Sequence, residues 1–365
     1  MSKKIFIAAT YQNVGKTTFS LGLIAGLKKR FKKIGFIKPI GQRYLMEQGY
    51  KVDEDSVLIE KVFGMGQGIS IKDLSPVAVE KGFTENYIQG ISKEDYAKII
   101  KESYEKIAVE NELVIIEGTG HAGVGSVFDL NNANVAKLLR SRVVLIAPGG
   151  VGRPIDEVML NKALFDKTGV KIAGVVVNKV VPEKFNKVNK LIRMGFKRKG
   201  VQTLGVMPYQ KRLDLPTIRE IMEEIEVPVL CGENNLEAPV DKILIIAMEI
   251  RDAVKYVENN SLVITPSSRH DALKAIIELQ EKSKDIRKIS GVVLTGDAEP
   301  DKEIISRLDK LNIPTLAIQT DTFTAAKKIN GIVVKVKPED KEKIRIIVDM
   351  VEKYVDFDAI LNNLT

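Results

Sequence analysis

The sequence has a single cysteine, two histidines and no tryptophan among its 365 residues. One cysteine cannot form an internal disulfide, and so few cysteines and histidines argue against a metal site built from them. Aromatic residues make up only 6% of the chain, so its cores must be mainly aliphatic. These scarcities exclude the small domains that depend on disulfides or structural zinc for their stability.

The sequence has no long apolar run, and we expect no amino-terminal leader. No apolar segment approaches the roughly 20 residues that cross a bilayer, and Met-Ser-Lys-Lys leads directly into a strand-like run. We therefore expect a cytoplasmic protein without membrane contact. The charge is only slightly unbalanced, with 56 basic and 48 acidic residues and a net charge of +8. Lysines spread over solvated faces would account for this excess, which argues against nucleic acid as a partner.

Short aliphatic runs alternate with helical patterns along the chain. Near-continuous Val, Ile and Leu are typical of strands buried on both faces of a parallel sheet. The alternation predicts an α/β fold, a doubly wound and mostly parallel sheet with helices on both faces. In the first part we expect strands at 4–8, 33–38, 113–116, 143–147, 172–177 and 203–206. Helices are expected at 17–30, 93–111, 132–139, 155–168 and 183–199, with a capping box at Ser92–Asp95 before the second.

The chain is too long for one ordinary core, so we expect two domains. A second α/β series begins after Pro208. Its strands are expected at 227–230, 242–246, 262–264, 291–294, 315–318 and 332–336. The polar segment 209–217 marks the boundary between the two series. We therefore expect a phosphate-loop domain at 1–212, a second, smaller α/β domain at 213–338 and a C-terminal segment at 339–365 that forms an amphipathic helix.

The segment from Ala9 to Thr18 reads ATYQNVGKTT and lies between an expected strand and an expected helix. This context is that of a phosphate-binding loop, in which successive backbone N–H groups and a helix N-terminus surround an anion. Gly15 would let the backbone approach the phosphates, Lys16 would reach the β- and γ-phosphates, and the Thr17 hydroxyl would hold Mg²⁺. Thr10 replaces the usual first glycine. The alternative is a helix that merely begins with Gly-Lys-Thr-Thr.

Further polar residues follow the expected strands at their carboxyl ends, where ligands bind in doubly wound folds. Lys38 ends the second strand, and Asp55 stands in the segment VDEDS. Glu117 directly follows the third strand, where a carboxylate is well placed for Mg²⁺. Asn178 ends the run VVVN and can offer both a donor and an acceptor to an adenine edge. Each residue also has a plain structural interpretation, as a surface lysine, a turn acid or a turn former.

With these residues in view, residues 1 to about 210 resemble dethiobiotin synthetase and its relatives. That group includes the amino-terminal domain of long phosphate acetyltransferases and the cobyrinic acid diamide synthase ATPases. The matching segments are ATYQNVGKTT, GFIKPI, DEDS, IIEGTG and VVVNKV, in this order. Threonine in place of the first loop glycine is normal in that family.

The resemblance implies an ATP- and Mg²⁺-dependent enzyme, a ligase or ATPase, that phosphorylates a carboxylate or carbamate of a small molecule. It also implies a homodimer. By the same resemblance, Lys16 and Lys38 would be catalytic, and Thr17, Asp55 and Glu117 would hold the metal. The nucleotide would contact Thr10, Asn13, Val14, Gly15, Lys16, Thr17, Thr18, Asn178 and Pro208, and the acceptor would contact Lys38, Gln42, Gly118, Thr119 and His121.

Two departures put the biotin substrate in doubt. The segment after Lys38 reads Pro-Ile-Gly-Gln-Arg-Tyr, without the serine expected to touch a diamino acid, and the loop after Glu117 carries Thr119 and His121 where the synthetase has smaller residues. The acceptor therefore stays open. The alternative function is a nucleotide-responsive regulatory protein whose ATPase domain controls the second domain, without small-molecule synthesis.

The second domain resembles the DRTGG domain, through RLDLPTIREI, ITPSSRHDAL, GVVLTGDAEPD and DTFTAA. Polar loops at 265–271, 295–297 and 321–324 each follow an expected strand and precede a helix. Ser267, Asp297 and Asp321 are expected to cap these helices. A small-ligand or nucleotide sensor cleft at the strand ends is compatible with capping.

One helical segment is strongly basic. Residues 184–199 carry seven Lys or Arg and no acid, and four of these cations recur every three residues as one stripe. RNA or another polyanion could bind such a stripe. No aromatic residue lies on this stripe, and a solvated helix face is the simpler interpretation.

Overall fold

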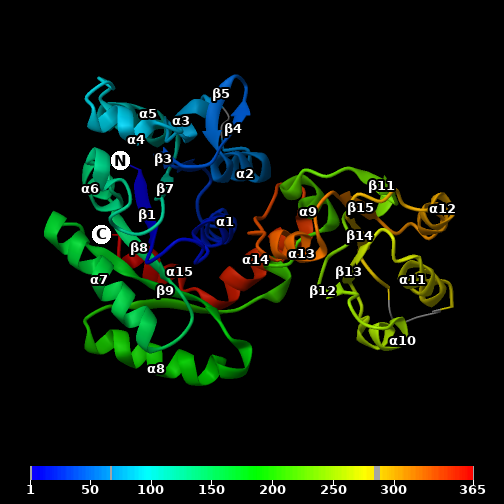
Figure 1. The fold of residues 1–365 in the computed structure, drawn as a ribbon. Coiled ribbons are helices and arrows are strands. Elements are labelled where there is room, and N and C mark those ends of the chain that lie inside the picture. The colour runs from blue at the N-terminus through cyan, green and yellow to red at the C-terminus, as the bar shows by residue number, and fades with distance from the viewer. Residues whose placement is uncertain (1, 66–67, 283–287, 365) are drawn as a thin grey trace. The chain divides into compact units, whose positions relative to one another are not determined.

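The computed structural model describes residues 2–65, 68–282 and 288–364, which divide into two compact units. Unit 1 comprises residues 1–210 and 336–365, and unit 2 comprises residues 211–335. The C-terminal segment thus folds within unit 1, and the termini of the chain both belong to that unit (Figure 1). Each unit is an α/β structure with a mostly parallel sheet.

The central sheet of unit 1 has six strands in the order β10-β9-β8-β1-β7-β2, and all neighbouring pairs are parallel. Almost every residue of these strands is buried, as the unbroken aliphatic runs predict. The six expected strands are confirmed, with bounds β1 Lys3–Ala9, β2 Ile34–Ile37, β7 Leu113–Glu117, β8 Arg142–Ala147, β9 Ile172–Val180 and β10 Thr203–Pro208.

Helices cover both faces of this sheet (Figure 1). One face packs against α5 Tyr96–Glu110, α6 Asn132–Leu138, α7 Gly152–Thr168 and α8 Phe185–Arg198, which share one apolar core with the strands. On the other face lie α1 Lys16–Leu27, α14 Lys341–Tyr354 and α15 Phe357–Asn362. The doubly wound fold expected from the sequence is confirmed.

Between β2 and α5 the chain forms short elements that extend from the sheet. They are β3 Ile40–Gly41, β4 Tyr44–Glu47, β5 Tyr50–Asp53, α2 Glu54–Phe63, α3 Ile71–Leu74, β6 Val77–Ala78 and α4 Phe83–Ile88. Strands β4 and β5 form an antiparallel hairpin, and β3 pairs with β6 in parallel. Unit 1 also contains the short 3₁₀ turns η1 Ser126–Phe128 and η2 Pro182–Lys184.

Unit 2 has a five-stranded sheet in the order β11-β15-β14-β13-β12, in which only β11 is antiparallel. Its strands are β11 Val229–Cys231, β12 Lys242–Ile245, β13 Ser261–Pro266, β14 Gly291–Thr295 and β15 Thr315–Ile318. Its helices are α9 Ile218–Ile225, α10 Ile250–Ala253, α11 His270–Lys282, α12 Lys302–Lys310 and α13 Thr322–Asn330, with 3₁₀ turns η3 Lys211–Leu213, η4 Glu233–Asn235 and η5 Val254–Tyr256. One apolar core lies on each face of the sheet.

Three local expectations for unit 1 and the segment that leads back into it are wrong. Asp95, not Ser92, caps α5 by accepting a hydrogen bond from the Lys98 backbone N–H at 3.0 Å, while the Ser92 hydroxyl pairs with the Tyr96 hydroxyl. Residues 332–336 are not a strand although they are aliphatic, since no neighbouring strand pairs with them. The C-terminal helix is broken into α14 and α15, because Val355 is extended and bridges Gly205 beside β10.

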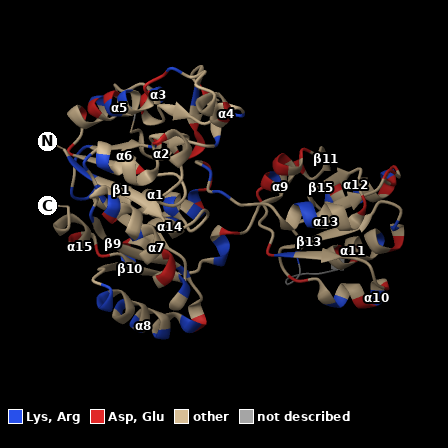
Figure 2. Cartoon of the chain, turned by 60° about the vertical axis from the view of Figure 1, so that its left-hand side comes forward, with Lys and Arg blue, Asp and Glu red and all other residues tan. Residues whose placement is uncertain are grey.

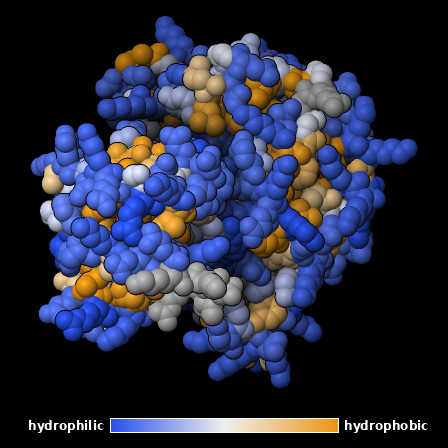
Figure 3. Space-filling model, turned by 90° about the vertical axis from the view of Figure 1, so that its right-hand side faces the viewer, coloured by the Kyte–Doolittle hydropathy of each residue, from blue (hydrophilic) through white to orange (hydrophobic). Residues whose placement is uncertain are grey.

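The surface shown in Figure 3 is largely hydrophilic, and its apolar residues form small separate groups. Scattered apolar residues are normal on a folded surface and need no partner. No helix in the described part of the chain is both long and apolar enough to cross a membrane.

Candidate functional site

The loop between β1 and α1 has the backbone of an anion-binding turn. Asn13 and Gly15 both have left-handed conformations, with φ of 57° and 97°. Gly15 immediately precedes α1, and its carbonyl accepts the first helical hydrogen bond from Phe19 N at 3.0 Å. Lys16, Thr17 and Thr18 occupy the first turn of α1. The first N–H groups of an α-helix have no acceptor within the helix, so this turn at the carboxyl edge of the sheet is suited to stabilise an anion.

Asn178 supports this loop from β9. Its amide nitrogen donates to the Val14 carbonyl at 2.9 Å, and its amide oxygen accepts from Lys179 N at 2.8 Å. A Cβ on Gly15 would lie 2.3 Å from the Asn178 amide nitrogen, so only glycine fits at this position. The second amide proton of Asn178 is available for another acceptor. The structure thus gives Asn178 a supporting contact, and its contact with a base stays a prediction.

Thr10, the residue that replaces the usual glycine, is linked to helix α7. Its hydroxyl donates to a Glu157 carboxylate oxygen at 2.7 Å, and Glu157 also accepts from Arg153 Nε at 2.7 Å. The Asn161 amide nitrogen lies 3.3 Å from the Thr10 carbonyl, and its amide oxygen accepts from Ala122 N at 2.8 Å. Side chains of α7 therefore connect the phosphate loop with the loop after β7.

Neither Glu157 nor Asn161 was predicted as a site residue. They lie one helical turn apart within α7 rather than directly after a strand. The only sequence signal was their four-residue spacing, which places them on one face of a helix.

Lys38 lies at the centre of a buried cluster of carboxylates. Its ammonium is 2.8 Å from an Asp53 oxygen and 3.9 Å from a Glu117 oxygen, and it also pairs closely with Asp55. All four side chains are almost fully buried. Asp53 was not predicted, although it stands two residues before Asp55 in the same segment. It also caps α2 by accepting from Asp55 N at 3.0 Å, so one side chain both starts the helix and pairs with the lysine.

The pKa values of this cluster are strongly perturbed. Burial alone would lower the pKa of Lys38, but attraction by Asp55, Asp53 and Glu117 outweighs it and raises that pKa. Burial raises the pKa of Glu117 to about 7, and repulsion from Asp55 acts in the same direction. A carboxyl group that titrates near neutral pH at a strand end is a common feature of functional sites.

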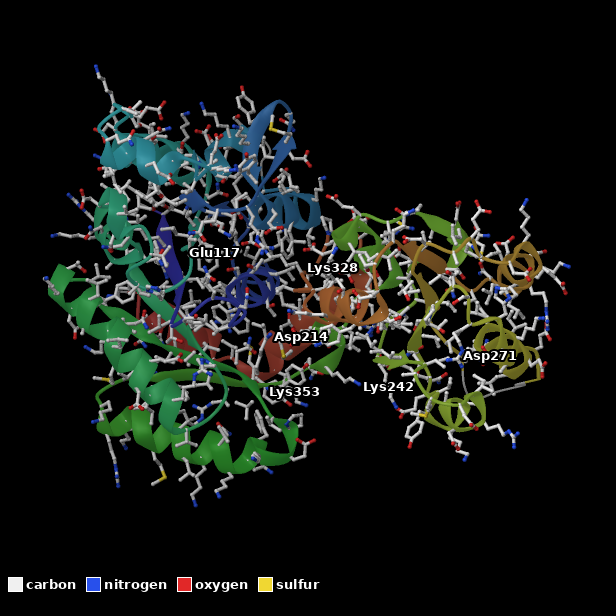
Figure 4. The ribbon with its side chains drawn as sticks, in the orientation of Figure 1. Glu117, Asp214, Lys242, Asp271, Lys328 and Lys353 are labelled. Atoms are coloured by element: carbon white, nitrogen blue, oxygen red, sulfur yellow. The ribbon has the colours of Figure 1, made fainter. Side chains whose placement is uncertain are left out.

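Glu117 also contacts the first two turns of α1. One of its oxygens accepts from the Thr17 hydroxyl at 3.0 Å and the other from the Ser20 hydroxyl at 2.5 Å. Figure 4 shows Glu117 in the interior of unit 1, near α1. The structure therefore brings together Thr17, Glu117, Asp55 and Lys38, as the sequence predicts, directly beside the phosphate loop.

The predicted acceptor residues lie at the same edge of the sheet. Thr119 donates through its hydroxyl to the Ile40 carbonyl, and its N–H donates to the Asn132 amide oxygen at 3.0 Å. A Cβ on Gly118 would lie 2.4 Å from that same oxygen, so the loop needs glycine there. Gln42 is exposed, and its N–H donates to Asp53 at 3.1 Å. His121 is exposed, and its Nδ1 accepts from Gly123 N at 3.2 Å, which matches a loop-forming role.

The donor set fits Mg²⁺ bound together with a triphosphate. Mg²⁺ prefers oxygen ligands and is usually held by one or two side chains plus phosphates and water. The Thr17 hydroxyl and the Glu117 carboxylate supply such oxygens side by side. Among the described residues no three His, Cys, Asp or Glu side chains are arranged to hold a metal alone. The fit thus requires the phosphates.

Pro208 ends β10, which is separated from β1 and its phosphate loop by β9 and β8. The contact of Pro208 with the nucleotide stays a prediction.

Polar loops also meet at the carboxyl edge of the unit 2 sheet. Gly296 N donates to the Thr320 carbonyl at 2.9 Å, and the hydroxyls of Thr295 and Thr322 pair at 2.8 Å. Asp321 caps α13 as expected, by accepting from Thr324 N at 3.0 Å. The expected cap at Asp297 is wrong, because α12 begins later and is capped by Asp301. The Ser267 hydroxyl donates to the Thr295 carbonyl at 3.3 Å.

Comparisons with known proteins give two matches that together cover most of the chain. Residues 3–217 match the family described as an AAA domain, and residues 220–332 match the DRTGG domain. A phosphate acetyltransferase of Pseudomonas putida is 26% identical over 374 residues, covering 96% of this chain and 50% of that protein. A phosphate acetyltransferase of Synechocystis is 24% identical over 378 residues, covering 100% of this chain and 52% of that protein. The chain thus spans about half the length of these relatives.

Similar solved structures include the MinC:MinD cell division complex of Aquifex aeolicus, with a TM-score of 0.38 and 15% identity over 58% of this chain and 84% of that chain. Another is the CBS and DRTGG regulatory region of Clostridium perfringens pyrophosphatase, with a TM-score of 0.29 and 15% identity over 58% of this chain and 88% of that chain.

Proposed function

The chain belongs to the AAA-domain family that matches residues 3–217, and from this premise we propose that it is a nucleotide-responsive regulatory protein. ATP and Mg²⁺ would bind at the loop between β1 and α1, and the state of the nucleotide would control the chain's DRTGG domain or an acetyl-transfer activity. The link to acetyl transfer is supported by the relatives that carry the name phosphate acetyltransferase. This chain spans about half of their length.

The observation that carries the proposal is the enclosure of Lys38. Its ammonium is held by Asp53 and Asp55 inside unit 1, and Glu117 is near. To assist phosphoryl transfer to an acceptor, Lys38 would first have to leave these buried partners, which is costly unless another cation replaces it. The cluster therefore suits a switch that responds to bound nucleotide and cation.

In this proposal each residue has a distinct task. The backbone N–H groups around Gly15 and the Lys16 ammonium hold the phosphates, while Thr17, Glu117 and Asp55 provide oxygens for Mg²⁺. Bound Mg²⁺ would supply positive charge that neutralises the phosphates. Glu117 and Asp55 would turn toward that charge, and the ion pairs of Lys38 would rearrange. The loop that contains Thr10 and the loop that contains Ala122 are both bonded to side chains of α7, so a rearrangement of one loop would be passed to the other.

Calorimetric titration with ATP and Mg²⁺ tests the nucleotide site. Lys16→Ala should reduce the affinity for ATP at least tenfold, because the lysine supplies the charge that faces the phosphates. Lys98→Ala, which removes an exposed lysine of α5, serves as a control with expected wild-type affinity. Equal affinity of wild type and Lys16→Ala would refute the assigned site.

A second candidate function is ATP-dependent phosphorylation of a small carboxylate. It is favoured by the position of Thr119 and Gly118 directly after Glu117, where an acceptor could approach the metal side of the site. ATP turnover that rises with added carboxylic or amino acids, and is lost in Lys38→Arg while ATP still binds, would favour it. Turnover that no small molecule stimulates would favour regulation.

Acetyl transfer is measured in the same preparation. Formation of acetyl phosphate from acetyl-CoA and phosphate, with and without ATP, would show whether the activity named in the relatives belongs to this chain. ATP-dependent changes in that rate would support regulation directly.

We also propose that unit 1 assembles as a homodimer, on the resemblance to dethiobiotin synthetase. Light scattering at increasing protein concentration tests this, and a monomer throughout would contradict it.

A further inference from the structure

The positive charge of the chain is concentrated in one segment rather than spread along it. Residues 184–199 contain seven Lys or Arg and no acid. The whole chain has 56 basic and 48 acidic residues, so the rest of the chain has 49 and 48. Nearly the entire excess of +8 therefore lies in helix α8 and the residues that flank it. The even spread expected from the overall composition does not hold.

Packing turns these charges outward. Val188, Ile192 and Phe196 are buried in the core of unit 1, and they fix which side of α8 faces the sheet. Figure 1 shows α8 as an outer helix of this unit, and Figure 2 shows basic residues along it. We call its exposed cations the basic face. The basic face consists of Lys184, Lys187, Lys190, Arg193, Lys197, Arg198 and Lys199.

The basic face differs from other solvated helices of this chain. On α5, Lys98 pairs with Glu102 and Lys101 with Glu105, each at 3.9 Å. Within the residues that the structure describes, no carboxylate forms an ion pair with any member of the basic face. Among the described side chains of the basic face only that of Arg193 forms hydrogen bonds, and both acceptors are neutral: the Asn189 amide oxygen at 2.8 Å and the Thr203 carbonyl at 3.3 Å. The repulsion among these cations is therefore left for an external anion to relieve.

Two apolar side chains lie among the cations. Leu191 is 38% exposed and Met194 is 49% exposed. Lys187, Leu191, Met194 and Arg198 follow one another at spacings of four, three and four residues, so they form one stripe on the helix. The aromatic side chain at the start of α8, Phe185, packs against Tyr354 with ring centroids 5.4 Å apart, so it is not free to stack on a base. Exposed aliphatic groups among lysines suit a lipid headgroup layer better than a nucleic acid.

We propose that the basic face of α8, together with Leu191 and Met194, is a docking surface for a bilayer that contains anionic phospholipids. The cations would lie against the headgroups, and the two apolar side chains would enter the boundary between headgroups and acyl chains. Lysine stems are long enough to let the ammonium groups stay among the headgroups while their methylene groups lie along the apolar layer. Such binding is peripheral, reversible and weakened by salt. It is independent of the nucleotide function proposed above.

Vesicle flotation with the full chain tests this surface. The protein should float with vesicles of phosphatidylcholine mixed with phosphatidylglycerol and stay behind with phosphatidylcholine alone. The triple variant Lys187→Gln, Lys190→Gln, Lys197→Gln should lower the partition coefficient roughly 100-fold, at about 1 kcal/mol per charge. A matched control, Lys93→Gln, Lys98→Gln, Lys101→Gln, removes the same charge from the α5 region and should bind like wild type. Equal losses in both variants would overturn the proposal.

Leu191 and Met194 provide a test that distinguishes binding to a bilayer from binding to another polyanion. Leu191→Gln with Met194→Gln keeps every charge and should lower vesicle binding roughly tenfold. Because all of these side chains are exposed, circular dichroism and thermal melting should match wild type in each variant. Failure of the wild type to float with anionic vesicles would overturn the proposal. So would tight binding of single-stranded RNA, lost in the lysine variant and unchanged in the Leu191 and Met194 variant, which would assign the face to nucleic acid.

Discussion

At the scale of single residues, Lys38 is the group on which the electrostatics of the site depend. Asp53, Asp55 and Glu117 surround it in the interior of unit 1, and their mutual repulsion is relieved by its charge. Breaking a buried ion pair from one side leaves uncompensated charge, which costs more than the pair contributes.

Lys38→Met should therefore lower the free energy of unfolding by about 3–5 kcal/mol in the absence of nucleotide. Chemical denaturation measures this, with Lys28→Met as a control on an exposed lysine, where a change within about 0.5 kcal/mol is expected. A loss no larger than in the control would mean that the carboxylates do not depend on Lys38.

Glu117 gives unit 1 a specific dependence on pH. Its pKa in the folded protein is about 7, compared with an ordinary value of 4.5. Between these values the folded state retains a proton that the unfolded state releases. The free energy of unfolding should therefore fall as the pH rises through this window, by an amount on the order of 3 kcal/mol from this group.

Glu117→Gln should remove this contribution, because glutamine does not titrate. The free energy of unfolding of both proteins, measured by denaturation from about pH 4 to about pH 8, checks this prediction. The contributions of all other titrating groups cancel in the difference between the two proteins, so the change of that difference with pH reports Glu117. Parallel curves for the two proteins would show that Glu117 titrates normally.

How far the sequence could reveal the site depends on where each residue lies. Lys38 follows β2, Glu117 ends β7 and Asn178 lies near the end of β9, and the carboxyl ends of parallel strands share one edge, so their proximity could be predicted. Asp53 and Glu157 act through tertiary contacts, one across a hairpin and one from within a helix. Asp53 ends β5, a short strand of mixed polarity that the sequence does not reveal, and Glu157 lies within α7, so only the folded chain brings them to the site.

At the scale of elements, the long aliphatic strands were predictable and the short ones were not. Strands β3 to β6 have two to four residues each, with mixed polarity, and they form only because the neighbouring backbone offers partners. The opposite error occurs at residues 332–336, which have strand composition but no partner strand. Pairing, which is not local, decides both cases.

Helix α1 shows a second non-local feature, a row of glycines that receives the C-terminal helices. A Cβ on Gly22 would lie 2.4 Å from Val351 on α14, and one on Gly26 would lie 2.5 Å from Phe357 on α15. Glycine normally weakens a helix interior relative to alanine. Here the absence of side chains lets α14 approach α1.

Gly22→Ala should therefore destabilise the protein by about 1–3 kcal/mol through overpacking, despite the better helix propensity of alanine. Gly152→Ala at the start of α7 is the matched control, because nothing lies within 4 Å of its added Cβ. Thermal denaturation of both variants checks the prediction. A stabilised Gly22→Ala would show that α14 can move away from α1 without loss.

At the scale of the whole molecule, unit 1 is discontinuous and unit 2 is continuous in sequence. Unit 2 has an apolar core on each face of its own sheet. Unit 1 receives its last two helices from residues 336–365, and Ile347, Met350 and Val351 of α14 are buried there. The two units therefore depend differently on the C-terminal segment.

A chain that ends at Lys335 should lose the cooperative unfolding of unit 1, because it exposes the face of α1 that α14 and α15 cover. Removal of three buried aliphatic side chains alone withdraws roughly 5–9 kcal/mol of apolar burial, which is comparable with the whole stability of a domain. The isolated segment 211–335 should instead unfold cooperatively at the same denaturant concentration as unit 2 within the full chain. Calorimetry and circular dichroism on the two fragments and the full chain separate these outcomes. A shortened chain that keeps an unchanged unit 1 transition would show that the sheet and its first eight helices are stable without their C-terminal cover.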